Sequence, residues 1–398
     1  MTAVISADHQ LLIDSVREYA RGELGEADRQ WDRSGESCCE RLDQFYEMGL
    51  MGLRIPEEQG GIACPMLPYA HIIRELSYAS PSVAVTVGVH SMVSEIIRLY
   101  ARDGLRERMQ QALAQPDNLG AFAVSEPDAG SDAAAVKTRA APAPGGWKLY
   151  GTKFWVTNGL AGRWHLVLAR TADTGANSDL SMLLLDARQP GVERRPIHGK
   201  MGIRGSETAE MALDGAFVPT ENMLGQPGDG LKVALSGLDG GRIGIASQAA
   251  GIAQACIDLM VAYAKERRQF ARPIADFQAI QWMIADSQTE LEAAQLLIDR
   301  AATLKDEADR VQRAAGAGSD GSGPPLRYFT RESSMAKLFA SEAANRIAYR
   351  AVQIHGGTGY VNECRVEQLY RDARITTIYE GTSEIQRHVI AREVLRGR

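Results

Sequence analysis

Apolar and polar positions follow a different pattern in each of three successive parts of this chain. In the first part, apolar side chains recur three or four residues apart, as at Leu12 and Val16, which is the spacing of one face of a helix. Two further runs, 72–78 and 83–100, have the same character. The pattern therefore predicts an N-terminal α-helical domain over residues 1–119.

The second part carries short apolar or aromatic runs that alternate with turn residues, which is typical of strands. The runs are 147–150, 154–157, 165–170, 181–185 and 210–213, and the turns include 145–146, 158–159 and 190–191. We expect a small β sheet or barrel domain over residues 120–232. Asn158-Gly159 is predicted to form a hairpin-type turn. Packing in the core is the common fate of a strand tryptophan such as Trp155.

Helical spacing returns in the third part. A long helix is predicted after Gly237, with Ile245, Ala249, Ile252, Cys256 and Met260 on one face. Further helices are predicted at 276–303, at 332–352 and from Ser383 onward. Together they predict a C-terminal α-helical four-helix bundle over residues 233–398. The expected fold class is α+β.

Composition narrows the function classes. The chain has 45% apolar and 24% charged residues and a net charge of −6, which argues against a general attraction to nucleic acid or anionic membranes. No stretch approaches the roughly 20 apolar residues that span a bilayer, and the N-terminus lacks the basic and apolar segments of a secretion signal. Five cysteines, with Cys38 and Cys39 adjacent, indicate reduced thiols, a cytoplasmic location and no metal site.

One glycine pattern is interpreted as a linker. Gly316, Gly318 and Gly321 match GxGxxG within the low-complexity stretch 314–325. A dinucleotide-binding fingerprint needs a strand before these glycines and a helix that opens within them. Here a charged helical tail precedes them and prolines follow, so a flexible loop is predicted.

The most informative carboxylate lies in the segment RITTIYEGTSEIQR, residues 374–387. Glu380 is followed by Gly381, which allows the backbone to bend and a ligand to approach closely. The Thr-Ser pair that follows can cap the next helix. Local physics alone predicts a capped helix beside a solvated glutamate.

Two other segments are candidates for ligand binding. FAVSEPDAGSD, residues 122–132, is a strand-like run that ends in a polar turn. Such a turn can offer backbone N–H groups and a hydroxyl to a flat polar ligand. FWVTNG, residues 154–159, is a strand followed by a turn. Taken alone, the first segment favours an ordinary Asx-type turn, and the second favours core packing by Trp155.

Together, these segments resemble the acyl-CoA dehydrogenase family in type and order. The resemblance spans nearly the whole chain and is strongest to the short-chain and butyryl-CoA branch. It implies that Glu380 removes the α-proton of an acyl-CoA thioester while the β-hydride passes to FAD, which gives a trans-2-enoyl-CoA. Desolvation would raise the pKa of this base, and hydrogen bonds to the thioester oxygen would stabilise the developing charge. The implied substrates are short- or medium-chain acyl-CoAs, linear or branched, as in fatty acid β-oxidation.

The resemblance also implies roles for residues in several separate segments. Trp155 would lie against the flavin, Thr157 would bond near its N5, and Arg267 would bind the pyrophosphate. The implied FAD-binding set is Phe122, Val124, Ser125, Ser131, Trp155, Val156, Thr157, Arg267, Gln278, Gln353, Ile354, Gly356, Gly357, Thr382, Ser383 and Glu384. The implied substrate-binding set is Ser131, Asp239, Arg242 and Gly381. Asp239 also suits a helix N-cap, and the two roles are compatible.

The position of the base distinguishes branches of the family. The isovaleryl and long-chain branches carry their glutamate in the segment that matches 238–242, where this chain has Gly241. Glu380 therefore indicates the short- and medium-chain arrangement. Residues 87–93 are expected to form the floor of the acyl pocket. In the family, FAD is shared across a subunit boundary, which implies a homo-oligomer, usually a tetramer. Electrons would pass to an electron-transfer flavoprotein.

Three alternatives stay open on the sequence alone. An acyl-CoA oxidase would differ in oxygen access, and a nitroalkane oxidase tends to carry Asp at the position of Glu380. A nucleic-acid-binding relative of the same fold should carry an extra basic region, whereas this chain is acidic and its tail, 394–398, is short. The retention of Glu380, Arg242, Trp155 and Thr157 argues against a catalytically silent acyl-CoA-binding scaffold.

Overall fold

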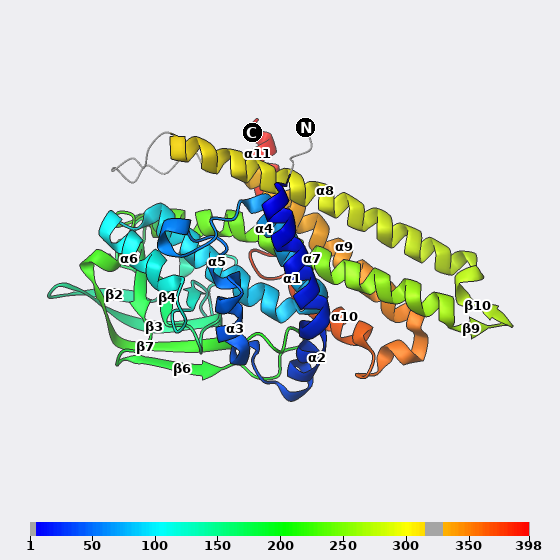
Figure 1. Ribbon diagram of the computed structural model, residues 1–398. Coiled ribbons are helices and arrows are strands. Elements are labelled where there is room, and N and C mark those ends of the chain that lie inside the picture. The colour runs from blue at the N-terminus through cyan, green and yellow to red at the C-terminus, as the bar shows by residue number, and fades with distance from the viewer. Residues whose placement is uncertain (1–4, 315–328, 398) are drawn as a thin grey trace.

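The computed structural model describes residues 5–314 and 329–397, which form a helical part, a β sheet and a set of long helices (Figure 1). All but the first residue of the predicted loop 314–325 lies outside the described residues. The N-terminal helices are α1 (Ala7–Tyr19), α2 (Gly25–Ser34), α3 (Leu42–Glu47), α4 (Met66–Ala79), α5 (Pro81–Tyr100) and α6 (Asp103–Leu113). Helix α5 begins where expected from capping rules, because Ser80 Oγ accepts the Val83 N–H at 3.1 Å and proline follows the cap.

The β sheet is mixed, and its strand order is β6-β7-β3-β2-β4-β5-β8, with β1 also paired to β4. Its strands are β1 (Gly120–Ala123), β2 (Arg139–Ala143), β3 (Gly146–Thr157), β4 (Trp164–Arg170), β5 (Leu180–Asp186), β6 (Val192–Pro196), β7 (Thr208–Pro219) and β8 (Met223–Leu224). Strands β1 and β2 run parallel to β4, and the other neighbours are antiparallel.

The turn at Asn158-Gly159 does not form a hairpin, so that prediction is wrong. Strand β3 pairs with β2 and β7, and the chain after Gly159 leads into β4 without pairing back on β3. The Asn158 amide instead donates to Thr86 O at 3.0 Å and to Gly120 O at 3.1 Å. This asparagine therefore ties the end of β3 to α5 and β1.

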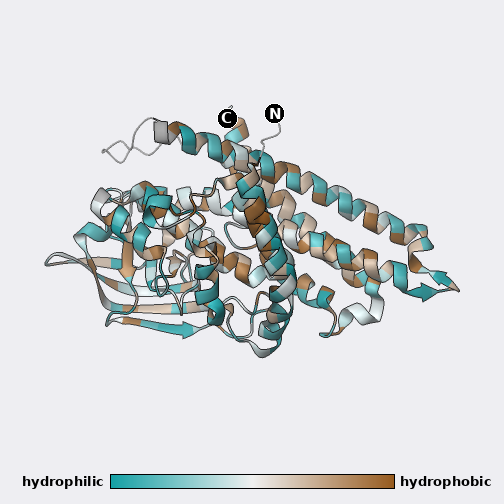
Figure 2. Ribbon diagram, viewed as in Figure 1, coloured by the Kyte–Doolittle hydropathy of each residue, from teal (hydrophilic) through white to brown (hydrophobic). Residues whose placement is uncertain are grey.

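The C-terminal part is built around one long helix. Its elements are α7 (Gly230–Glu266), the hairpin β9 (Arg268–Gln269) and β10 (Arg272–Pro273), α8 (Gln278–Ala314), α9 (Thr330–His355), α10 (Arg365–Ile375) and α11 (Ser383–Leu395). Helix α7 packs against α4, α5, α8 and α9. Figures 1 and 2 show its far end leading to the hydrophilic β9–β10 hairpin, away from the sheet. The predicted α+β fold class is confirmed.

Two details of the helices differ from the sequence-based expectation. Helix α7 begins at Gly230 rather than after Gly237, so Asp239 lies inside the helix and is not an N-cap. Helix α10 was not predicted, although its buried residues Val366, Leu369 and Ala373 have helical spacing. Charged residues between them made the apolar pattern too sparse to stand out.

Helices α5 and α7 have the length and mean hydropathy of a membrane-crossing helix, so the expectation that no such stretch is present is wrong. However, 83% of the relevant window of α5 and 72% of that of α7 are buried inside the protein. Both are therefore central helices of the apolar core.

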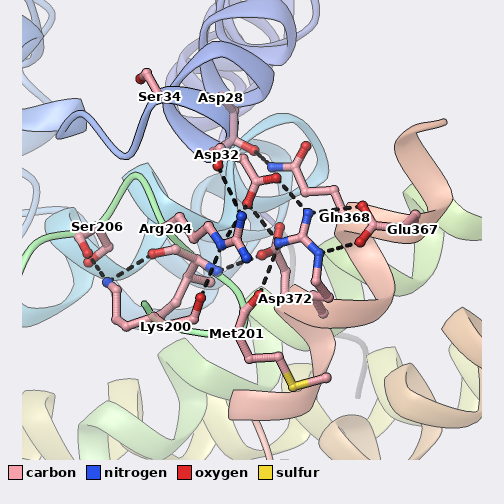
Figure 3. A network of polar contacts seen from close by, with 12 residues as sticks. Asp28, Asp32, Ser34, Lys200, Met201, Arg204, Ser206, Glu367, Gln368 and Asp372 are labelled. Atoms are coloured by element: carbon pink, nitrogen blue, oxygen red, sulfur yellow. Dashed lines mark hydrogen bonds and ion pairs between the residues drawn. The ribbon is translucent and has the colours of Figure 1, made fainter. Parts of the chain in front are cut away.

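A polar network joins the N-terminal helices, the sheet part and the C-terminal helices (Figure 3). Arg371 of α10 donates to both carboxylate oxygens of Asp32 of α2, at 2.8 and 2.5 Å. The next residue, Asp372, accepts the backbone N–H of Ile203 at 2.5 Å. Lys200 donates to Ile203 O at 3.1 Å, so the loop before β7 is held to α10. This docking matters for the site because Ile203 packs with Val85 and Val89 of α5.

Candidate active site

Glu380 lies in the loop between α10 and α11, and this loop has an unusual backbone. Glu380 has φ 54° and Gly381 has φ 87°, so two consecutive residues are in the left-handed region. Lys337 of α9 donates to Gly381 O at 2.7 Å, and Gln386 of α11 donates to Glu380 O at 3.0 Å. These bonds fix the loop carbonyls and thereby the direction of the Glu380 side chain.

Glu380 is half-buried as a residue, and one oxygen of its carboxylate is shielded from solvent and unsatisfied. Glu380 Oε2 is buried and has no hydrogen-bond partner among the described residues. Burial raises the pKa of Glu380 to about 7, and the positive charges of Arg242 and Lys337 oppose this rise. The solvated glutamate expected from local physics is therefore not what the fold produces. A carboxylate with a pKa near neutrality is suited to act as a base.

An apolar cavity adjoins this carboxylate. It is lined by Tyr69, Ile73, Ala84, Val85, Gly88, Val89, Met92, Gly241, Gly244, Ile245, Gln248 and Glu380. Three of these residues, Gly88, Val89 and Met92, fall in the stretch 87–93 that was expected to form a pocket floor. A Cβ at Gly241 would lie 2.9 Å from Glu380 Oε2. Positions 241 and 380 therefore converge on the same point in space.

Asp239 and Arg242 form a buried pair on α7 close to this site. Arg242 Nη1 donates to Asp239 Oδ1 and to Ser334 Oγ of α9, the latter at 3.2 Å. Asp239 Oδ2 accepts the hydroxyl of Thr330 at 2.7 Å. The pair thus joins α7 to the start of α9 and keeps a positive charge near Glu380.

A second group of predicted residues gathers at the end of β3. A bulge interrupts the pairing of β3 and β7 between Lys153 and Val156. At this bulge Trp155 has φ 60°, and 58% of the residue is exposed. Core packing is therefore the wrong expectation for Trp155. Its ring meets that of Phe154 edge to face, with 5.0 Å between centroids. Val156 is buried, and Thr157 pairs with Thr208 of β7.

The turn after β1 is held by a buried ion pair that the sequence reading did not assign. Lys153 Nζ donates to Glu126 Oε1 at 2.8 Å and to Val124 O at 3.0 Å, and the Phe154 N–H donates to Ser125 O at 2.9 Å. Burial lowers the pKa of Lys153 to about 8, and Glu126 opposes this shift. The sequence did not single out Lys153, because β3 also carries the exposed Lys148. Phe122 is half-buried, and Ser131 is exposed beyond the turn.

A third group of predicted residues lies at the other end of the long helices. Arg267, beside β9, and Gln278, at the start of α8, are exposed. Gln353 is also exposed near the end of α9, where Gly356 and Gly357 follow. Ile354 is buried in the main apolar core. Figure 1 shows the β9–β10 hairpin at the end of the molecule away from the sheet. A single chain therefore does not unite this group with the Trp155 group.

The start of α11 follows the Glu380 loop directly. Thr382 is the N-cap, and its hydroxyl accepts the Ile385 N–H at 3.3 Å. Ser383 Oγ is buried without a hydrogen-bond partner among the described residues. Glu384 is exposed in the first helical turn, where its own backbone N–H is the main cause that lowers its pKa. The helix start predicted from the Thr-Ser pair is confirmed.

Several positioning residues could not be found from local sequence. Lys337 and Tyr379 are examples, since Lys337 holds the Glu380 loop and the Tyr379 hydroxyl donates to Gln248 of α7. These two contacts join positions 44 and 131 residues apart, whereas the Gln386 contact spans only 5 residues within the 374–387 segment.

Comparison with known proteins agrees with this architecture. Family models of the acyl-CoA dehydrogenase N-terminal, middle and C-terminal domains match residues 6–117, 121–216 and 228–395. The mitochondrial short-chain specific acyl-CoA dehydrogenase of Mus musculus is 41% identical over 98% of this chain and 90% of its own length. A probable acyl-CoA dehydrogenase of Bacillus subtilis is 38% identical over the full length of both chains.

Solved structures show the same likeness. Butyryl-CoA dehydrogenase from Megasphaera elsdenii has a TM-score of 0.91 and 33% identity, with all of both chains covered. An acyl-CoA dehydrogenase of Bacillus anthracis in complex with FAD has a TM-score of 0.90 and 31% identity, and the match covers 98% of this chain and 67% of that one. The chain therefore belongs to the acyl-CoA dehydrogenase family of FAD-dependent oxidoreductases.

Proposed function

We propose that this chain catalyses the α,β-dehydrogenation of short- or medium-chain acyl-CoAs, linear or branched, to trans-2-enoyl-CoAs, with Glu380 as the base. The observation that carries the proposal is the buried, unpartnered Glu380 Oε2 beside an apolar cavity. A buried acceptor without a partner costs roughly 1–3 kcal/mol. An acidic C–H group of a substrate at this position would supply the missing contact.

The residues around Glu380 support a concerted removal of a proton and a hydride. Oε2 takes the proton from Cα, and the electron pair of that C–H bond forms the Cα–Cβ double bond as the hydride leaves Cβ. Arg242 and Lys337 keep part of the Glu380 population ionised near neutral pH. The apolar lining excludes water, which strengthens the base.

The residues near β3 fit a flat cofactor. Trp155 presents an exposed aromatic face on a fixed bulge, and the turn held by Lys153 and Glu126 lies beside it. Bound FAD supplies the hydride acceptor. Trp155 would lie against the ring, with Thr157 and the 122–131 turn at its edge. Thr382, Ser383 and Glu384 would also contact the cofactor, and Gly381, Asp239 and Arg242 would contact the thioester and CoA.

The cavity favours an uncharged acyl group. No described residue that lines it is a lysine or arginine, so a second carboxylate on the acyl chain would lack a counter-charge. This supports a simple acyl-CoA over a dicarboxylic one, although a glutaryl-CoA dehydrogenase is among the structural neighbours. Small residues, including Ala84 and Gly88, line the cavity, and its small volume of about 20 Å³ favours a short acyl chain over a long one.

The remaining proposals concern partners and location. An electron-transfer flavoprotein is the proposed acceptor, and one structural neighbour with 35% identity comes from work on such a flavoprotein of Acidaminococcus fermentans. A homo-oligomer, in the form of a tetramer, would let the Arg267, Gln278, Gln353 and Gly356-Gly357 group of one chain complete the FAD site of another. A cytoplasmic role in fatty acid β-oxidation is proposed.

Replacement of the base tests the proposal. Glu380→Gln keeps the size of the side chain but cannot accept the proton, so we expect bound FAD and no flavin reduction by butyryl-CoA under anaerobic conditions. Glu342→Gln, at a half-exposed position of α9 that pairs with Arg387, is the matched control and should be reduced normally. Unimpaired reduction of Glu380→Gln would exclude Glu380 as the base. Rapid turnover of the wild type with oxygen as sole acceptor would favour the oxidase alternative.

A further inference from the structure

The cavity beside Glu380 is backed by a second cavity between α5 and α7. Both cavities are small, and each has a volume of about 20 Å³. Tyr69, Gly88, Met92 and Gly241 line both cavities, so these four residues form the wall between them. Glu380 lines only the first cavity.

Tyr69 of α4 supplies most of the bulk of this wall. The residue is 4% exposed. A Cβ at Gly88 of α5 would lie 3.9 Å from Tyr69 Oη, and a Cβ at Gly244 of α7 would lie at the same distance. The phenol oxygen thus stands between two positions that have no side chain. The space that these glycines leave open is occupied by a tyrosine from a third helix.

The second cavity has an apolar side and a polar side. Met66, Ile96 and Leu99 are apolar parts of its lining. At its polar side, Arg54 is paired with Glu95 at 3.0 Å, so no unpaired cation is offered to a substrate there. Ser91 also lines it, and its buried Oγ makes no well-aligned hydrogen bond to a described residue.

We propose that Tyr69 sets the acyl-chain length that this enzyme accepts, an inference that rests on the proposed function. With Cα held at Glu380, an acyl chain that runs along the cavity ends against the Tyr69 phenol. Removal of the phenol would join the two cavities, and a longer chain would then pass between Gly88 and Gly244 toward Leu99. Tyr69 is therefore a specificity-determining residue and not part of the chemical step.

The test compares anaerobic flavin reduction of the wild type and Tyr69→Ala by butyryl-, hexanoyl-, octanoyl- and dodecanoyl-CoA. One methylene changes selectivity by about 10- to 200-fold in a closed pocket. The ratio of second-order rate constants, octanoyl over butyryl, should therefore rise about tenfold or more in Tyr69→Ala. Tyr69→Phe keeps the ring and should keep the wild-type ratio. Tyr78→Ala makes the same change elsewhere on α4 and should also leave the ratio unchanged.

The possible results are distinct. An unchanged ratio in a folded, FAD-loaded Tyr69→Ala protein would overturn the role of Tyr69 while leaving the proposed function intact. A wild-type protein whose flavin is reduced faster by dodecanoyl-CoA than by butyryl-CoA would also overturn the role of Tyr69. If Tyr69→Ala does not fold, Gly88→Val adds bulk to the same wall, and it should lower the hexanoyl-to-butyryl ratio about tenfold. No reduction of the wild type by any of the four thioesters would overturn the proposed function, and this inference with it.

Discussion

Glu380 combines a left-handed backbone with a buried carboxylate, and each feature is unfavourable by itself. A non-glycine residue in this conformation is strained by of order 1–3 kcal/mol. The strain is tolerated because Lys337 of α9 and Gln386 of α11 donate to the carbonyls of Glu380 and Gly381. As a result, the base is oriented before any substrate arrives.

The pH dependence of the reaction should report the ionisation of this residue. Because Glu380 is active only as the carboxylate and its pKa is about 7, the second-order rate constant for flavin reduction should rise with pH and level off above pH 7. Well below that value the increase should be about tenfold per pH unit. Stopped-flow measurement of flavin bleaching between pH 5 and 9 checks this.

Lys337 offers an independent check of the same assignment. Its positive charge lowers the pKa of Glu380, so Lys337→Met should move the midpoint of the profile to higher pH. Arg346→Met, which removes an exposed cation elsewhere on α9, should leave the midpoint in place. A profile that is flat from pH 5 to 9 would contradict the base assignment.

Among single residues, the motif around Glu380 identified it as a candidate base, but the sequence did not predict that its carboxylate would be buried. Local rules predicted a solvated side chain, because burial of the carboxylate depends on α5 and α7, which are more than a hundred residues away. The exposure of Trp155 could not be predicted from the sequence either, because a strand pattern carries no signal for the bulge that turns this side chain outward.

On the scale of elements, the turn after β1 depends on one ion pair with β3. Lys153 is fully buried, and Glu126 accepts from it as well as from the backbone N–H groups of Lys137 and Thr138, at 2.6 and 2.9 Å. The pair fixes the distance between the two segments that are proposed to hold the flavin ring.

Removal of one partner of this pair should destabilise the protein. Lys153→Met leaves the Glu126 charge buried, so the free energy of unfolding should fall by about 3 kcal/mol. In the double variant Lys153→Met/Glu126→Gln the loss should be smaller, because no uncompensated charge remains. Urea unfolding of the FAD-loaded proteins measures both. An equal or larger loss in the double variant would show that the charge is not the cause.

The elements themselves were largely predictable. Apolar spacing gave the long helices, and Gly145 between β2 and β3 marks a real hairpin. The start of α7 and the existence of α10 were not apparent, because glycines in one and charges in the other weaken the pattern. Pairing of β3 with β7 was also beyond local reasoning, since the two strands are separated by three others in sequence.

For the whole molecule, the contacts of α10 with α2 and with the loop at Ile203 join the three parts (Figure 3). Asp372 is the buried member of this network with an unusual ionisation. Burial raises its pKa to about 7, Asp28 and Asp32 add to the rise, and Arg365 opposes it.

Asp372 should make the protein less stable as pH rises. Its folded-state pKa lies above the ordinary value, so the folded protein retains a proton that the unfolded chain has lost between about pH 4 and 7. Asp372→Asn keeps an oxygen for the Ile203 N–H and stays neutral. Its unfolding free energy relative to the wild type should increase by at least about 1 kcal/mol from pH 5 to 8, as measured by urea unfolding. A constant difference would contradict this.

The packing of the three parts of the chain against one another was the feature least predictable from the sequence. Composition and motifs indicated the family, and the family match confirmed it, but the polar contacts that dock the parts join residues up to 340 positions apart. The two separated groups of proposed FAD residues also became apparent only in three dimensions.

The contact between Gly241 and Glu380 bears on how harmful variants of this protein would be recognised. Even alanine at position 241 would place a methyl carbon 2.9 Å from the carboxylate oxygen, closer than such atoms normally approach. The base would have to move, although no charged or polar residue had been altered. A ranking of substitutions by chemical severity would score glycine to alanine as mild, whereas displacement of Glu380 should impair flavin reduction at this position.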